Sequence, residues 1–154
     1  MPIRFPAVAV YGVKAMVDLA LHEGQGPIST VAIAKRHTIP AECLEQVLHR
    51  LRRAGLVVAE RGARGGYQLS RPPAQISVAD IVQVFDRAPR RTADPASARS
   101  RDSGAVDHAT RLVWARIEAA IGATLTTTTL AELATEARRR HTNHTVNHTY
   151  TFHI

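Results

Sequence analysis

Apolar residues recur at the spacing of a helix in the first third of the chain. From position 8 to 22 the larger apolar residues stand three or four apart and a glycine-containing segment ends the pattern, so we expect a mostly buried first helix. Ser29 is suited to cap a short second helix over 30–37, because its hydroxyl can accept a hydrogen bond from the backbone of the first turn. The residues expected to face inward in this second helix are Val31, Ile33 and Ala34.

A third helix is expected to begin at Pro40 and to end at Gly55. Proline suits a first helical turn because it has no amide hydrogen to leave unpaired, and glycine readily takes the left-handed conformation that closes a helix. The apolar residues form one face, and the polar residues lie elsewhere on the helix. The apolar face comprises Leu44, Val47, Leu48, Leu51 and Ala54, and the polar residues are Glu42, Glu45, Gln46, His49, Arg52 and Arg53.

Two short β-like runs follow, 56–60 and 67–70, and the segment between them contains three glycines and two arginines. Glycines allow a tight turn with positive φ, so the sequence predicts a β-hairpin whose tip carries Arg61 and Arg64. A pair of prolines ends the second strand, since proline cannot continue a hydrogen-bonded ladder.

The rest of the chain divides by composition. A fourth helix, capped by Ser77, completes a first unit over 1–87. Residues 88–107 are rich in Pro, Ser, Ala, Arg and Asp without an apolar period, which indicates a flexible arm. Residues 108–137 are expected to form a long helix and a short final helix, separated by four consecutive threonines, and 138–154 a disordered basic, His/Thr/Asn-rich tail.

The order of these elements is typical of a winged helix-turn-helix, a mainly α fold with a small β-hairpin wing. The third helix would lie in the major groove of double-stranded DNA, and the hairpin would follow a neighbouring backbone or the minor groove. The long helix that follows has a stripe of apolar residues with little left to cover in so small a chain.

Charge and cysteine content support this interpretation. The 154 residues carry 20 Lys and Arg against 13 Asp and Glu, a formal net charge of +7 that favours a polyanionic partner. The single cysteine, Cys43, cannot form an internal disulfide, which fits a reducing, cytoplasmic location. The most apolar stretch contains Lys14 and Asp18, so we expect no contact with a membrane.

Several motifs are more specific than the element order. They are Ile39-Pro40, Leu44-Glu45-Gln46-Val47-Leu48, Leu51-Arg52-Arg53-Ala54-Gly55-Leu56-Val57, Arg61-Gly62-Ala63-Arg64-Gly65-Gly66-Tyr67-Gln68-Leu69, Arg71-Pro72-Pro73 and Ile76-Ser77-Val78-Ala79-Asp80-Ile81. Together they resemble the Rrf-two (IscR/NsrR/CymR-like) family of bacterial winged helix-turn-helix transcription regulators. The resemblance is close over 11–85 and resumes at 113–114 and 129–134.

The resemblance implies a homodimer, joined through the long helix, that binds a partly palindromic operator, most simply as a repressor. The expected dimerisation residues are Val113, Trp114, Ile117 and Ile121, with ordinary core packing as the alternative for the tryptophan.

The family's DNA-contacting glutamate, glutamine and wing arginine carry over to Glu45, Gln46 and Arg61. The chemistry agrees, since glutamate can accept from cytosine, glutamine can pair with adenine, and arginine suits a narrow minor groove. The further candidates are His49, Arg52 and Arg64. Solvated faces of the helix and the hairpin are the alternative.

The sequence departs from the family pattern in the turn before the third helix, in the arm and at Cys43. Thr38 stands where glycine is usual in the turn before the third helix, and since a β-branched residue resists positive φ we expect that turn to be built differently. The arm lacks the cysteines that hold an iron–sulfur cluster in many relatives, so no cofactor is expected. His108 is a candidate metal ligand, with a solvated histidine favoured, and Cys43 is a candidate thiol switch, with a small packing residue favoured.

Two other classes of function compete with a DNA-binding regulator. An enzyme is disfavoured because the glycine-rich segment leads into a strand instead of a helix, and no catalytic spacing is present. A winged-helix module that signals through a partner protein is the second alternative, and the basic wing argues against it. Any signal is expected to arrive through a small ligand, a partner protein or oxidation of Cys43.

Overall fold

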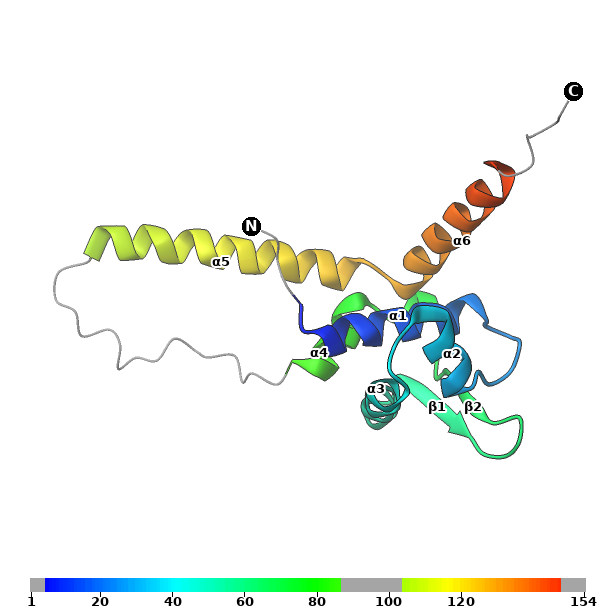
Figure 1. Cartoon of the computed structure of the whole chain (residues 1–154). Helices are drawn as coiled ribbons and strands as arrows, with labels where there is room; N and C mark the ends of the chain where they lie inside the picture. Colours follow the sequence, from blue (N-terminus) through cyan, green and yellow to red (C-terminus); the bar gives the residue numbers. More distant parts are fainter. Residues whose placement is uncertain (1–4, 87–103, 148–154) are drawn as a thin grey trace, which may run out of the picture.

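A computed structural model describes residues 5–86 and 104–147. The elements are α1 (Ala7–Leu21), α2 (Thr30–His37), α3 (Ala41–Arg53), β1 (Val57–Glu60), β2 (Gly66–Leu69), a 3-10 turn η1 (Pro73–Gln75), α4 (Val78–Phe85), α5 (Gly104–Thr127) and α6 (Leu130–Asn147). Figure 1 shows α1 to α4 and the hairpin gathered into one unit, from which α5 and α6 extend in opposite directions. The mainly α fold with a two-stranded wing is confirmed.

The core lies where α1, α3 and α4 meet. On α3 the four residues Leu44, Val47, Leu48 and Leu51 are buried, as the apolar spacing predicts. Buried residues of every other helix in the unit and of α6 join them: Ala15, Met16, Leu19, Ile33, Ile81, Phe85, Leu130 and Ala134.

Two of the residues expected to face inward are exposed. Val31 is 72% exposed because it stands two positions before Ile33, which places the two side chains about 200° apart around a helix of 3.6 residues per turn. Ala54 lies just beyond the last residue of α3 and is exposed as well. The end of that helix is otherwise as expected, with Gly55 at φ +78°.

The turn between α2 and α3 corrects the expectation drawn from Thr38. This residue takes the left-handed conformation itself, with φ 52° and ψ 45°, and so does what glycine would do there. Its N–H donates to the carbonyl of Ala34, and the N–H of Ile39 donates to the same oxygen over 3.0 Å. The two hydrogen bonds and the burial of Ile39 hold the backbone in this conformation despite the branched side chain.

The hairpin is antiparallel, and β1 pairs with β2 from Val57 opposite Leu69 to Glu60 opposite Gly66. Gly66 is required here, because a Cβ atom would collide with the carbonyl of Ile28. This close approach allows Ile28 and Tyr67 to exchange two backbone hydrogen bonds of 2.9 and 2.8 Å. The hairpin is therefore attached to the segment that leads into α2.

The C-terminal helices are longer than the pattern predicts. α5 begins at Gly104, inside the expected arm of 88–107, and the remainder of that arm up to 103 lies outside the described residues. Asp107 stands in the first turn of α5, where a negative charge favours a helix, so the helix starts before its apolar stripe does.

α6 continues to Asn147, through ten residues that were expected to belong to the disordered tail over 138–154. Glu136 forms ion pairs with Arg139 and Arg140 at 3.0 and 3.1 Å, the i+3 and i+4 spacing that supports a helix. Arg138 also donates to the carbonyl of Ala20 on α1 over 3.3 Å. Residues 148–154 lie outside the described part of the chain.

Capping at Ser77 is confirmed, and the residue next to it links α4 to the C-terminal helices. The Ser77 hydroxyl accepts from the N–H of Asp80, whose carboxylate accepts from the N–H of Ser77, a complete capping box. Next to it the N–H of Val78 donates to Thr128 over 2.9 Å, at the threonine break between α5 and α6. Within the described ranges, the helices are all too short or too polar to cross a membrane.

Candidate nucleic-acid interface

The surface of α3 opposite the core is polar and continuous. Because Leu44, Val47, Leu48 and Leu51 are buried, most residues at the intervening positions face outward. The structure brings the four predicted helix candidates, Glu45, Gln46, His49 and Arg52, together on one exposed face, where Glu42 is exposed as well. We call these five residues the reading face.

Arg50 lies beside the reading face but turns inward. Its guanidinium donates to the carbonyl of Val84 over 2.7 Å and lies 4.8 Å from the centre of the Phe85 ring. A cation over an aromatic face and a hydrogen bond to a carbonyl together attach α3 to α4. Its place in a run of polar residues gives no signal for this role, because the partners are 34 and 35 positions away.

The wing carries its arginines at an exposed tip. Figure 1 shows β1 beginning beside α3 and the hairpin running away from that helix, with its tip pointing away from the core. Arg61 and Arg64 are both exposed at this tip, as predicted. Gly62 has φ +114°, a conformation open to glycine, and the N–H of Gly65 donates to its carbonyl over 2.9 Å. The turn is thus fixed by its own backbone, which leaves both arginine side chains free for an external partner.

A buried carboxylate joins α1 to α2 behind the reading face. Asp18 accepts from Arg36 through two hydrogen bonds of 3.0 and 2.7 Å, and His37 Nε2 lies 2.9 Å from its Oδ1. His22 lies on the other side, with Nδ1 2.7 Å from the main-chain oxygen of Asp18. The only sequence signal for this cluster is an acidic residue within an otherwise apolar helix.

The environment of Asp18 holds its carboxyl ionised. Burial alone raises the pKa, because a charge is costly in a low dielectric, but the hydrogen bonds from Arg36 and His37 and the charges of Arg36 and His22 outweigh it. The net result is that the pKa of Asp18 lies below its usual range.

The structure separates the residues that were considered for redox or metal chemistry. Cys43 is exposed near the start of α3, so the favoured interpretation as a packing residue is wrong. Position 43 precedes the buried Leu44 by one, which turns its side chain about 100° away from the core. His108 is exposed in α5. Across residues 5–86 and 104–147 we find no group of three His, Cys, Asp or Glu side chains placed to hold a metal ion.

The second candidate surface is the long helix. No residue of α5 is buried within the single chain, and its large apolar side chains are exposed, Val113 by 55%, Trp114 by 58% and Ile117 by 39%. Ile121 is half-buried. Core packing is therefore excluded for Trp114 within one protomer.

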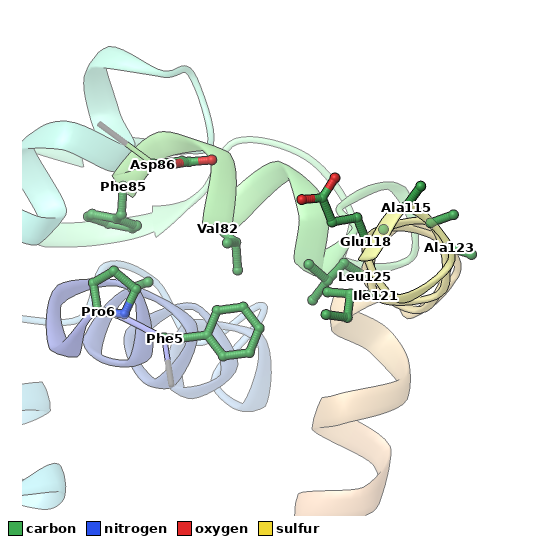
Figure 2. Close-up of a pocket in the computed structure, with 13 residues that line it drawn as sticks. Phe5, Pro6, Val82, Phe85, Asp86, Ala115, Glu118, Ile121, Ala123 and Leu125 are labelled. Carbon is green, nitrogen blue, oxygen red and sulfur yellow. The ribbon is translucent and has the colours of Figure 1, made fainter. Parts of the chain in front are cut away.

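A groove runs between α5, α4 and the start of α1. It encloses about 1000 Å³. Figure 2 shows Phe5, Val82, Ile121 and Leu125 pointing into it and the Glu118 carboxylate at its rim. An apolar groove beside an exposed apolar helix leaves a large hydrophobic surface in contact with water.

The fold and the reading face define a winged helix-turn-helix protein. Comparison with known proteins assigns the family: residues 7–136 match the family described as Rrf2, an iron-dependent transcriptional regulator. The chain belongs to the Rrf2 family of transcriptional regulators. This confirms the family inferred from the motifs, and the family is one of regulators and not of enzymes.

Individual relatives agree. The chain is 42% identical over 129 residues to a protein of Synechocystis sp. named as a helix-turn-helix transcriptional regulator, covering 83% of this chain and 85% of that one. It is similar to the structure of IscR from T. potens, with a TM-score of 0.72, 36% identity and coverage of 89% and 90%. CymR, the global cysteine regulator of B. subtilis, gives a TM-score of 0.69 at 31% identity, covering 88% and 98%.

Proposed function

We propose that this protein is a dimeric, sequence-specific repressor of transcription in the cytoplasm, which occludes a promoter by binding a partly palindromic duplex. The observation that carries the proposal is the exposed reading face of α3 next to a wing tipped by two arginines. A helix of this kind fits the major groove, and the wing would reach the adjacent minor groove.

The side chains on these surfaces have complementary roles. Glu45 can accept a hydrogen bond from cytosine N4, and Gln46 can bond to the N6 and N7 atoms of adenine. Arg61 is suited to a narrow minor groove, where the negative potential is strongest. His49, Arg52 and Arg64 add donors for phosphate oxygens, which position a protein on DNA without reading sequence.

Binding can be tested with duplex DNA selected by the purified protein from a random library. Arg61→Ala should weaken binding to the selected duplex by roughly 1–3 kcal/mol if the arginine reads the groove. A phosphate contact would instead lower affinity evenly across sequences and reduce the salt dependence. Arg139→Ala is the matched control, since Arg139 is an exposed arginine on α6, a helix that extends away from α3 (Figure 1). Unchanged affinity and salt dependence for Arg61→Ala would remove the wing from the interface.

The dimer is supported by α5. This helix has 24 residues and no buried side chain, so it gains little stabilisation from contacts with its own chain. Helices in water are stabilised chiefly by such packing. A second copy would cover Val113, Trp114 and Ile117 and fill the groove beside Ile121. Two protomers would also place two reading faces on one duplex, which a module of this size needs for specific affinity.

We also propose that the regulator works without an iron–sulfur cluster. Such clusters are held mainly by cysteine thiolates, and the chain has one cysteine. That thiol is exposed near the start of α3, whereas His108 lies in the first turns of α5, which extend away from the unit that contains α3 (Figure 1). The donor set therefore does not fit the group. The signal would be a small ligand, a partner protein or oxidation of the exposed Cys43.

A further inference from the structure

The helix α2, which precedes α3 and its reading face, makes few apolar contacts. α2 is eight residues long and buries two side chains, Ile33 and Ala34, both in its middle. Its last turn instead carries Lys35, Arg36 and His37, none of which belongs to the hydrophobic core. Something other than apolar contact must hold the end of this helix.

Asp18 supplies that contact. Its side chain is 3% exposed and binds two consecutive residues of the last turn, Arg36 through both carboxylate oxygens and His37 through Oδ1. A bidentate pair between guanidinium and carboxylate fixes direction as well as distance. The end of α2 is thus tied to α1 at a defined orientation.

The orientation of α3 depends on the contact between Asp18 and the last turn of α2. His37 is followed directly by Thr38 in its left-handed conformation, then by the buried Ile39, and α3 starts two residues later at Ala41. If the last turn of α2 rotated by a few degrees, the short, strained turn would transmit the rotation to α3, and the reading face would point in a different direction. Arg50 holds the opposite end of α3 to α4, so the two contacts together fix the helix at both ends.

We infer that Asp18 is a positioning residue for DNA reading: through Arg36 and His37 it sets the direction of α3, although it touches no DNA itself. The inference rests on the proposed function. Loss of the contact should therefore reduce discrimination between sequences more than it reduces affinity for DNA in general, because phosphate contacts tolerate small shifts and base contacts do not.

The test measures binding to the duplex selected by the wild-type protein and to a scrambled duplex of the same composition, at a temperature where each variant is fully folded. Asp18→Asn preserves the shape of the side chain and removes its charge. We expect the ratio of the two affinities to fall about tenfold or more, comparable to the loss of one base-pair contact, with affinity for the scrambled duplex changed less than twofold.

His37→Asn and His22→Asn form a matched pair for the case in which Asp18→Asn does not fold. Both histidines lie against Asp18, but His37 belongs to α2 and His22 to the end of α1. The inference expects His37→Asn to lower discrimination and His22→Asn to leave it unchanged. A purely stabilising cluster would affect the two variants alike.

The outcomes separate this inference from the proposed function. If the wild-type protein selects no sequence, the proposed function fails. If it does select one, and folded Asp18→Asn or His37→Asn discriminates as well as the wild type, the positioning role of Asp18 is refuted while the proposed function stands.

Discussion

Among the residues that the structure describes, Thr38 is the one non-glycine residue with a positive φ. The left-handed conformation costs an L-residue about 1–2 kcal/mol, whereas glycine loses about 0.4–1 kcal/mol more conformational entropy on folding. The conformational cost of threonine is larger than the entropy cost of glycine. The side chain of Thr38 is exposed, so removing it loses no packing.

Thr38→Gly should therefore raise the free energy of unfolding by roughly 0.5–1 kcal/mol. Urea denaturation measures this directly. Thr38→Ala is the control, because it keeps the Cβ atom that causes the strain and should bring little gain. A glycine variant less stable than the wild type would show that the threonine is not strained.

The buried carboxylate of Asp18 makes stability depend on pH. Its pKa is lower in the folded protein than the ordinary value of 3.8, so the folded state prefers the ionised form. The stabilisation is complete above that value and is lost as the pH falls from it through the lower pKa of the folded state, where the unfolded chain binds the proton first.

Denaturation at a series of pH values from about 6 down to about 2.5 tests this expectation. The difference in unfolding free energy between wild type and Asp18→Asn should be greatest near neutrality, on the order of 2–3 kcal/mol, because removal of one member of a buried pair leaves Arg36 uncompensated but partly solvated. The difference should shrink in acid. A difference that stays constant with pH would mean that the charge of Asp18 does not stabilise the fold.

At the scale of elements, the helix most in need of a partner is α5. Charged residues in place of Trp114 and Ile117 would put ions into the proposed dimer interface, at a cost of several kcal/mol when unpaired. Trp114→Glu combined with Ile117→Glu should give monomers in sedimentation experiments.

These monomers should keep the folded unit of α1 to α4 and the hairpin but lose helical content in α5, which then lacks the packing of a partner. They should also lose binding to the selected duplex, because one reading face alone contacts one half-site. His108→Glu is a suitable control, as it adds a charge to an exposed residue in the same helix outside the apolar stripe. Variants that remain dimeric would exclude the exposed stripe of α5 as the interface.

At the scale of the whole molecule, the separation of Cys43 from His108 leads to an expectation about sensing. Purified protein should be colourless, and its DNA binding should be indifferent to iron chelators and nitric oxide, since one thiol per chain does not complete a cluster. Anaerobic reconstitution with iron and sulfide is the direct measurement. Stable visible absorption with stoichiometric iron that disappears in His108→Ala would overturn the cluster-free proposal.

The reading face and the wing could be predicted because their signals are local. Spacing of apolar residues identified the core side of α3, and therefore also the exposed Glu45, Gln46 and His49. Ser29, Gly55 and Gly62 fulfil the roles that their backbone preferences suggest. The predicted burial was wrong at Val31 and Cys43, which stand one or two positions before a buried residue. The apolar pattern around them is too short to show which side of the helix they occupy.

The sequence by itself determined the order of the elements, their caps and which side of α3 faces outward, since these depend on residues within about four positions of each other. Only the tertiary structure decided the rest. Asp18 contacts residues of α2 that are 18 and 19 positions away along the chain. Arg50 donates to a carbonyl 34 positions away, and Arg138 donates to one 118 positions away. Burial of Ile39 in the core helps to hold Thr38 in a conformation that its side chain resists. The contact of Arg138 with α1 supports α6 beyond the start of the expected tail. In both places tertiary packing outweighs a local preference of about 1 kcal/mol.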